Sequence, residues 1–187
     1  MTRTARVAPG ERSQIGLINA TIAAALGRAA GTEAPNLFLT LGRHRRLFRG
    51  WLHFAGTLMP GGRLSRRETE ITILRVAHRR ACDYELAHHR NLGARAGLTT
   101  GDIDLLGSDD AADDPRWSPS EGDLLRAVDQ LLETRDLDDE HWAALRCYYD
   151  ERQLIELVML VGHYEMLATA ITTLGIQADL PRRRRRG

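Results

Sequence analysis

Lysine is absent from this chain of 187 residues, because all 26 residues counted as Lys or Arg are arginine. Without a lysine amine the protein cannot form a Schiff base with a carbonyl substrate or anchor pyridoxal phosphate. Cysteine is scarce as well. Cys82 and Cys147 lie far apart, each inside a helical pattern, so we expect no disulfide framework. This usage favours a reducing compartment, and we expect a cytoplasmic protein.

Long apolar runs are also missing. No stretch approaches the roughly 20 apolar residues needed to cross a bilayer. Residues 15–26 are apolar and follow early arginines, as in a secretory signal. The large apolar residues there nevertheless recur with the spacing of an amphipathic helix: Ile15, Ile18, Ile22 and Leu26. We therefore expect neither a cleaved signal nor membrane association.

The charge balance excludes a general polyanion-binding protein. The net charge is +1, with 43% hydrophobic and 27% charged residues, which is typical of a soluble globular domain. The one basic run is the five arginines at 182–186, which have no aromatic residues between them. We interpret this run as a solvated tail and do not expect nucleic-acid binding.

Alternating strand patterns are absent, so the sequence predicts an all-α fold. Residues 1–12 are expected to form a disordered tail, 13–176 a single helical domain, and 177–187 an Arg-rich C-terminal tail. An acidic segment at 107–119, rich in turn-forming residues, is expected to be a surface loop. The predicted helices cover residues 13–30, 37–59 (with a break near Gly42), 65–78, 82–97, 102–106, 119–134, 138–148 and 151–174.

Residues 70–89 contain the candidate site. Ser65 and Glu68 have the spacing of a capping box that opens one helix. A second helix begins at Cys82 and places a thiol, a carboxyl group and an imidazole on one face: Cys82, Glu85 and His89. The same face continues with apolar residues, which indicates burial. Buried ionisable groups without partners are costly, so we expect a mutually satisfied cluster that also includes Glu70.

Cys82 allows two interpretations. Most buried cysteines are inert packing residues. Cys82, however, is predicted at a helix N-terminus, where free N–H groups and the helix dipole favour a thiolate nucleophile. Cys147 has no acid or base at helical spacing and is interpreted as structural.

Several histidines have weaker claims to a site. Glu85 and His88 form the E-x-x-H fragment of di-iron helical bundles, but the chain offers no second fragment, so we expect no metal. His163 and Tyr164 are either a core pair or part of the same pocket, and we favour the core. His44 and Trp51 allow the same two interpretations.

The stretch from Leu64 onward resembles the carboxymuconolactone decarboxylase-like superfamily, which includes alkylhydroperoxidase D. The motifs that carry the resemblance are L-S-R-R-E-T-E-I-T-I-L-R-V-A, C-D-Y-E-L-A-H-H and A-G-L-T. The resemblance implies an all-helical fold that assembles into dimers, trimers or hexamers. Alkylhydroperoxidase D-like members have a glutamate, a C-x-x-C pair and a histidine, and these fall on Glu70, Cys82, Glu85 and His89.

Glu85 replaces the second cysteine of that pattern, so no resolving thiol is present and a disulfide cycle within the site is excluded. The resemblance implies a cofactor-free enzyme that transfers protons on a small lactone or carbonyl acid, with decarboxylation as the leading reaction. In this hypothesis His89 is the acid/base, Glu70 and Glu85 tune it, Cys82 assists, and Tyr84 and His88 support the pocket. A single-cysteine peroxide-reducing protein and a non-catalytic oligomeric binding module remain alternatives.

Overall fold

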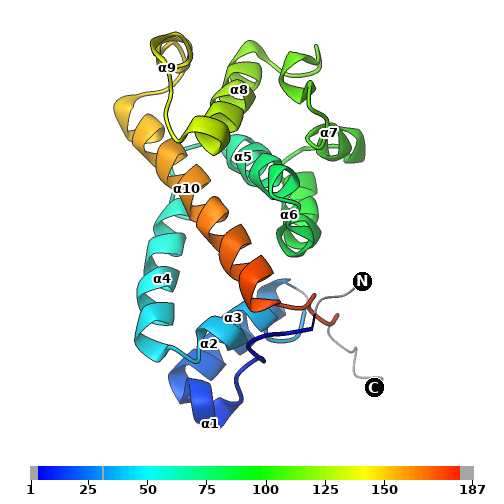
Figure 1. Cartoon of the computed structure of the whole chain (residues 1–187), viewed down its shortest axis with the longest axis vertical. Helices are drawn as coiled ribbons and strands as arrows, with labels where there is room; N and C mark the ends of the chain where they lie inside the picture. Colours follow the sequence, from blue (N-terminus) through cyan, green and yellow to red (C-terminus); the bar gives the residue numbers. More distant parts are fainter. Residues whose placement is uncertain (1–3, 31, 182–187) are drawn as a thin grey trace. The chain divides into compact units, whose positions relative to one another are not determined.

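The computed structural model describes residues 4–30 and 32–181. Within these ranges its regular elements are helices, and an isolated bridge between Thr32 and Pro181 is the one extended pairing (Figure 1). The predicted all-α class is therefore confirmed. The elements in chain order are α1 (Arg12–Ile15), α2 (Leu17–Ala30), α3 (Asn36–Leu41), α4 (Arg45–Leu58), α5 (Arg66–Arg79), α6 (Asp83–Arg95), α7 (Thr100–Leu105), the 3-10 turn η1 (Ala111–Asp113), α8 (Pro119–Thr134), α9 (Asp139–Arg146) and α10 (Glu151–Leu174).

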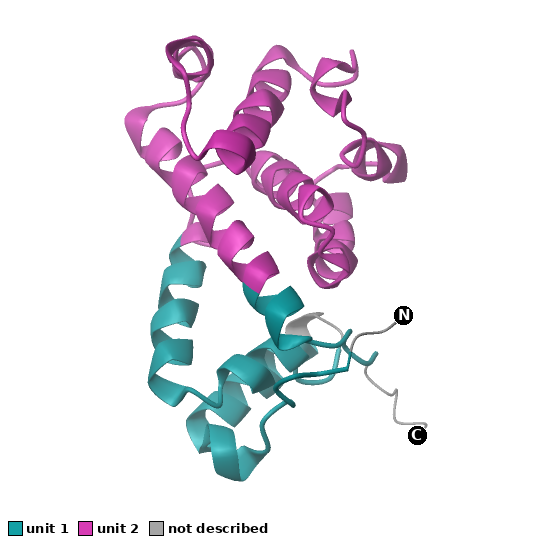
Figure 2. Cartoon of the chain, in the orientation of Figure 1, with its two compact units in different colours: residues 1–57, 170–187 teal, residues 58–169 magenta. Residues whose placement is uncertain are grey.

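The chain divides into two compact units, which Figure 2 colours separately. The first unit comprises residues 1–57 and 170–187, and the second comprises residues 58–169. This division runs through the segment 13–176 that the sequence analysis treats as one domain. Every residue of the predicted site belongs to the second unit.

Helix α5 is the central helix of the second unit and packs against α6 and α8. Its residues 69–77 are all buried, so this part of the helix is enclosed on every side. The predicted capping box is confirmed: the Glu68 N–H donates to Ser65 Oγ, and the Ser65 N–H donates to Glu68 Oε2. This cap defines where α5 begins, and hence where Glu70 lies.

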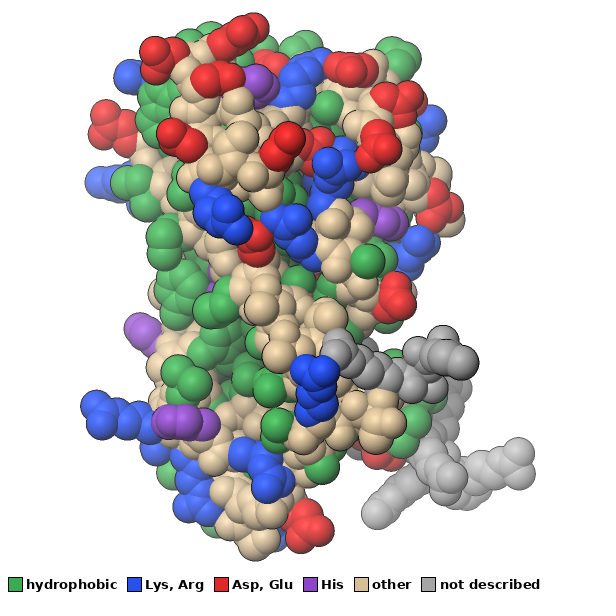
Figure 3. Space-filling view, viewed as in Figure 1, with side chains coloured by type: hydrophobic (Ala, Val, Ile, Leu, Met, Phe, Trp, Pro, Cys, Tyr) green, Lys and Arg blue, Asp and Glu red, His purple; other side chains and the backbone are tan. Residues whose placement is uncertain are grey.

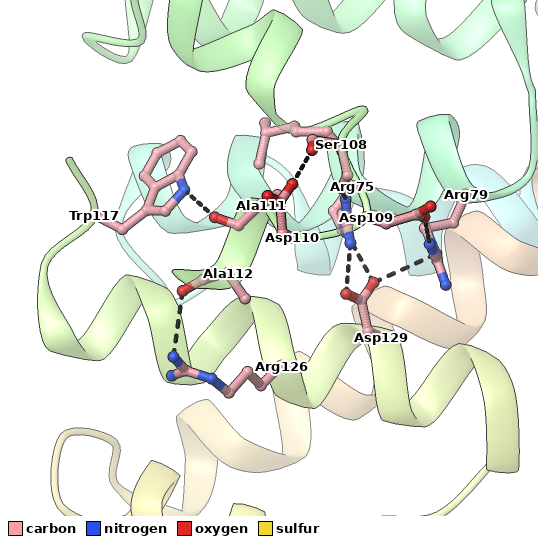
Figure 4. Close-up of polar contacts among 11 residues, drawn as sticks. Arg75, Arg79, Ser108, Asp109, Asp110, Ala111, Ala112, Trp117, Arg126 and Asp129 are labelled. Carbon is pink, nitrogen blue, oxygen red and sulfur yellow. Dashed lines mark hydrogen bonds and ion pairs between the residues drawn. The ribbon is translucent and has the colours of Figure 1, made fainter. Parts of the chain in front are cut away.

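A fully buried arginine connects α5 to the acidic loop (Figure 4). The guanidinium of Arg75 donates two hydrogen bonds to Asp129 on α8, at 2.8 and 2.6 Å. It also donates to the carbonyl oxygens of Leu106 and Ser108, at 2.7 and 2.5 Å. The loop after Leu106, predicted as a surface loop, is therefore held at its base by the core of the unit.

The N-terminal segment differs from its prediction. Residues 4–11 were expected to be disordered, but the Arg6 and Val7 N–H groups donate to the Leu174 carbonyl, and Gly10 donates to Leu39. Residues 1–3 and the arginine run at 182–186 lie outside the described residues.

Helix α10 is apolar enough and long enough, by length and composition alone, to cross a membrane, which the sequence analysis did not expect. Half of its most apolar window is buried within the structure, as in the core helix of a globular protein. Every exposed position of α10 between residues 155 and 169 is uncharged. Elsewhere, on the face shown in Figure 3, acidic and basic side chains are interspersed.

Candidate functional site

The site is built by three helices of the second unit. Helix α5 carries Glu70, and α6 carries Glu85 and His89, with Cys82 as its N-cap residue. A tight junction joins the two helices: Ala81 adopts a left-handed conformation, with φ of 48°, and the Cys82 N–H donates to the Ala77 carbonyl at 2.8 Å. This turn reverses the chain directly before the site, so that α6 packs back against α5.

The centre of the site is a hydrogen bond between His89 and Glu70. Nδ1 of His89 donates to Oε2 of Glu70 across 2.7 Å, and both side chains are at least 95% buried. The other ring nitrogen, Nε2, lies 3.4 Å from Oε2 of Glu85, one helical turn earlier on α6. The imidazole is therefore held between two carboxyl groups, as the sequence analysis predicted for these three residues.

Tyr164 on α10 completes the cluster. Its hydroxyl lies 3.3 Å from Nε2 of His89, and its ring meets the imidazole edge-on with centroids 5.2 Å apart. The sequence favours a core role for Tyr164, but the structure places this residue in the site. The sequence indicated only that a buried tyrosine on an apolar helix needs a polar partner for its hydroxyl, and not that this partner is His89.

The surroundings of His89 favour its charged form. Burial by itself would lower the pKa of the imidazole, but the hydrogen bonds to Glu70 and Glu85 and their charges outweigh burial and raise the pKa to about 9. For Tyr164, burial and the charges of Glu85 and Glu70 raise the pKa well above its usual value. At neutral pH the cluster thus contains a protonated imidazole and a neutral phenol.

Cys82 is buried, with 2% of its surface exposed. Burial raises the pKa of its thiol to about 11; the backbone amides of Glu85 and Tyr84 oppose this rise, whereas the charges of Glu85 and Asp83 add to it. The expectation that the N-terminus of α6 would favour a thiolate is therefore wrong, because burial and nearby carboxylates exceed the effect of the amides. Cys82 lies next to Glu85 as a neutral thiol.

The remaining predicted residues have identifiable neighbours. Tyr84 is buried and packs against half-buried His88, with ring centroids 4.7 Å apart; their supporting role stays a prediction. His163 is buried, and its ring meets the Tyr164 ring edge-on at 5.2 Å. Burial lowers the pKa of His163.

The first unit contains the other two candidates. The His44 ring accepts a hydrogen bond from the Leu47 N–H, and Trp51 packs against Phe38 and Phe48. Both arrangements agree with the structural interpretation of these residues. Among the described residues, no group of three or more His, Cys, Asp or Glu side chains is arranged to hold a metal ion.

Comparison with known proteins identifies relatives of this chain. The model of the carboxymuconolactone decarboxylase family matches residues 45–129, which include Glu70, Cys82, Glu85 and His89. No protein of curated function matches the sequence.

Solved structures share the fold. A peroxidase-related protein from Ralstonia eutropha JMP134, with an alkylhydroperoxidase AhpD core, is 16% identical with a TM-score of 0.82, over 95% of this chain and 94% of its own. A peroxidase-related protein from Silicibacter sp. TM1040 is 12% identical with a TM-score of 0.77, over 90% and 91% of the two chains. The debrominase Bmp8, in a cysteine-to-alanine variant bound to 2,3,4-tribromopyrrole, is 16% identical with a TM-score of 0.76, over 95% and 93%. Residues 45–129 thus match the carboxymuconolactone decarboxylase family, and the whole chain shares the fold of structures with an alkylhydroperoxidase AhpD core.

Proposed function

We propose that the protein is a cofactor-free enzyme that decarboxylates a small lactone acid or carbonyl acid, with His89 as the proton donor. The observation that carries this proposal is the buried contact between His89 Nδ1 and Glu70 Oε2 at 2.7 Å. It stores a proton on the imidazole at neutral pH, away from bulk water. Protonation of carbon needs such a donor, positioned in an enclosed site.

The two nitrogens of His89 have different tasks in this reaction. The proton on Nδ1 is held by the short bond to Glu70, whereas Nε2 has longer contacts, 3.3 Å to Tyr164 and 3.4 Å to Glu85. The Nε2 proton is therefore the one available to substrate. Cleavage of the bond to the carboxylate releases CO2 and leaves the electron pair on carbon. That carbon takes the Nε2 proton, and solvent then restores the imidazolium.

The substrate carboxylate needs a cation, because Glu70 and Glu85 would repel it. Arg66, on the first turn of α5, lies close enough to Tyr164 for its charge to lower the pKa of the tyrosine against the stronger effect of burial. Its side chain is exposed and so can meet a ligand from solvent. We assign Arg66 to hold the substrate carboxylate. The debrominase among the structural relatives binds a small ring, which supports a small-molecule substrate here.

The test is a screen of purified protein against small lactone acids and β-keto acids, with release of CO2 as the readout. For a substrate that is turned over, the His89→Gln variant should lose about 100-fold or more of kcat, because it keeps the size of the side chain but not the proton. Glu165→Gln removes a carboxylate that pairs with Arg80 in the same unit and serves as the control. Unchanged turnover in His89→Gln would contradict the assignment.

Single-cysteine peroxide reduction is the second candidate, supported by the backbone amides near the Cys82 sulfur and by the peroxidase-related relatives. The thiolate would attack the peroxide oxygen to give a sulfenic acid and an alcohol. Two external thiols would then reduce the sulfenic acid to the thiol, and they would themselves be oxidised to a disulfide with release of water. The raised pKa of Cys82 slows the first step. Mass spectrometry of a Cys147→Ser variant after brief peroxide treatment decides: rapid oxidation of Cys82 supports this function, and an inert Cys82 removes it.

The non-catalytic alternative would be favoured by a pocket filled by its own side chains, with Glu70 and His89 apart. Their direct hydrogen bond argues against it.

A further inference from the structure

The two oxygens of the Glu85 carboxyl group lie in different surroundings. Oε2 lies 3.4 Å from Nε2 of His89. Oε1 is buried and accepts no hydrogen bond from the described residues, although the side chain is only 6% exposed. Leaving a buried acceptor unmatched costs about 1–3 kcal/mol, and more when the acceptor is charged. An oxygen held in this way inside a candidate site indicates a ligand that donates to it.

The neighbours of Glu85 define what that ligand can be. Its carboxylate acts electrostatically on His89, Tyr164 and His163, so it faces the cluster that holds the transferable proton. A substrate carboxylate at Oε1 would meet a like charge, and an ammonium group would meet the protonated imidazole. A neutral hydroxyl donates one hydrogen bond without adding charge, which fits both neighbours.

We propose that Glu85 Oε1 accepts a hydrogen bond from a hydroxyl group of the substrate, so that the site selects hydroxylated lactones or carbonyl compounds over their deoxy counterparts. This inference rests on the proposed function, because it places the substrate beside His89. A site built around a buried acceptor discriminates strongly, since a ligand without the donor leaves that acceptor unpaired. The carboxyl group, at the position where related sequences carry a second thiol, thereby serves recognition instead of sulfur chemistry.

Binding rather than turnover tests the inference. The probes are α-hydroxy-γ-butyrolactone and α-methyl-γ-butyrolactone, which have similar size and differ in the O–H donor. We expect the wild-type protein to bind the hydroxylated lactone about tenfold more tightly or better, measured by NMR titration. Glu85→Met, a side chain of similar length without a strong acceptor, should bind the two lactones equally. The control Glu165→Gln should keep the wild-type preference.

Each contrary result overturns the inference. Equal binding of the two lactones by the wild-type protein does so, as does a preference that survives in Glu85→Met. Failure of both lactones to bind up to about 0.1 M also does so, because a donor that satisfies the buried Oε1 should give at least that affinity. Circular dichroism checks the fold of each variant, and Glu85→Gln, which keeps an oxygen but loses the charge, should show a reduced preference. Because the readout needs no turnover, a failed CO2 assay with intact lactone discrimination contradicts only the proposed reaction.

Discussion

His89 illustrates how residues from separate helices create a property that none has alone. Burial disfavours its charge, and Glu70 with Glu85 restores it, so the side chain is protonated where a solvent-exposed histidine would be neutral. Each partner is hydrogen-bonded or charged, and removal of one leaves the others buried without compensation.

Stability should depend on pH through this residue. Against the opposing effect of burial, Glu70 and Glu85 raise the pKa of His89 from 6.5 to about 9 in the folded state. Protonated His89 therefore contributes its full stabilisation to the folded state below pH 6.5, and this stabilisation is lost as the pH rises through about 9. We expect the free energy of unfolding, measured in urea, to fall by about 3 kcal/mol across that window.

Two variants check the assignment. In His89→Gln the fall in the free energy of unfolding above pH 6.5 should disappear. In His163→Gln it should persist, because burial lowers the pKa of His163, and that residue costs stability only as the pH falls. Parallel curves for the wild-type protein and His89→Gln would show that another group is responsible.

The sequence predicted part of this cluster. Glu85 and His89 are four residues apart on one helix, and local periodicity is enough to place them on one face. The role of Tyr164 in the site was missed. Its contact with His89 spans 75 residues of chain, and no local sequence pattern reveals a contact at that separation. The protonation of Cys82 was predicted wrongly for a related reason: the helix terminus is visible in the sequence, and the depth of burial is not.

At the scale of elements, the junction of α5 and α6 carries strain. Ala81 has a φ of 48°, a region that side chains with a Cβ occupy at a cost of about 1–2 kcal/mol and that glycine occupies freely. Ala81→Gly should therefore raise the free energy of unfolding by about 0.5 kcal/mol or more. Ala87→Gly, at an exposed position inside α6, should instead lower it by about 1 kcal/mol. Equal losses in both variants would argue against strain at the junction.

The connection between α5 and the acidic loop depends on one side chain. Arg75→Met removes the partner of Asp129 and of two carbonyl groups, so we expect a loss of about 3 kcal/mol in urea unfolding. Arg79→Met is the matched control one turn later. Its close partner, Asp109, is 99% exposed, and the loss should stay below about 1 kcal/mol. A similar small loss in both variants would mean that the buried arginine contributes no more than a surface pair.

Helices were predicted well because their signals are local. The capping residues Ser65 and Ser118 begin helices where the sequence analysis placed them. The break after α1 was missed, although Gly16 adopts a φ of 82° there. Order in residues 4–11 could not be predicted, since it depends on backbone bonds to Leu174, at the other end of the chain.

At the scale of the whole molecule, we expect self-association through the exposed side of α10. Its exposed positions between residues 155 and 169 are uncharged, and its large exposed side chains are apolar: Ile155, Val158, Met159 and Met166. Light scattering should give the mass of a dimer, trimer or hexamer for the wild-type protein. Met159→Arg should yield monomers, because it introduces a charge into the contact.

Leu17→Arg adds the same charge at an exposed apolar residue of α2 and should leave the mass unchanged. A monomeric wild-type protein, or one that binds lipid vesicles through α10, would contradict this prediction.

The enclosure of His89 also has a kinetic consequence. A proton given to a product must be replaced from bulk water, yet the ring is 4% exposed and the Tyr164 hydroxyl lies 3.3 Å from Nε2. To regain its proton, His89 requires either proton transfer through the Tyr164 hydroxyl or a transient movement of α10 that admits water. The rate of this proton uptake would then limit turnover, and turnover would slow in deuterium oxide even if bond cleavage were fast.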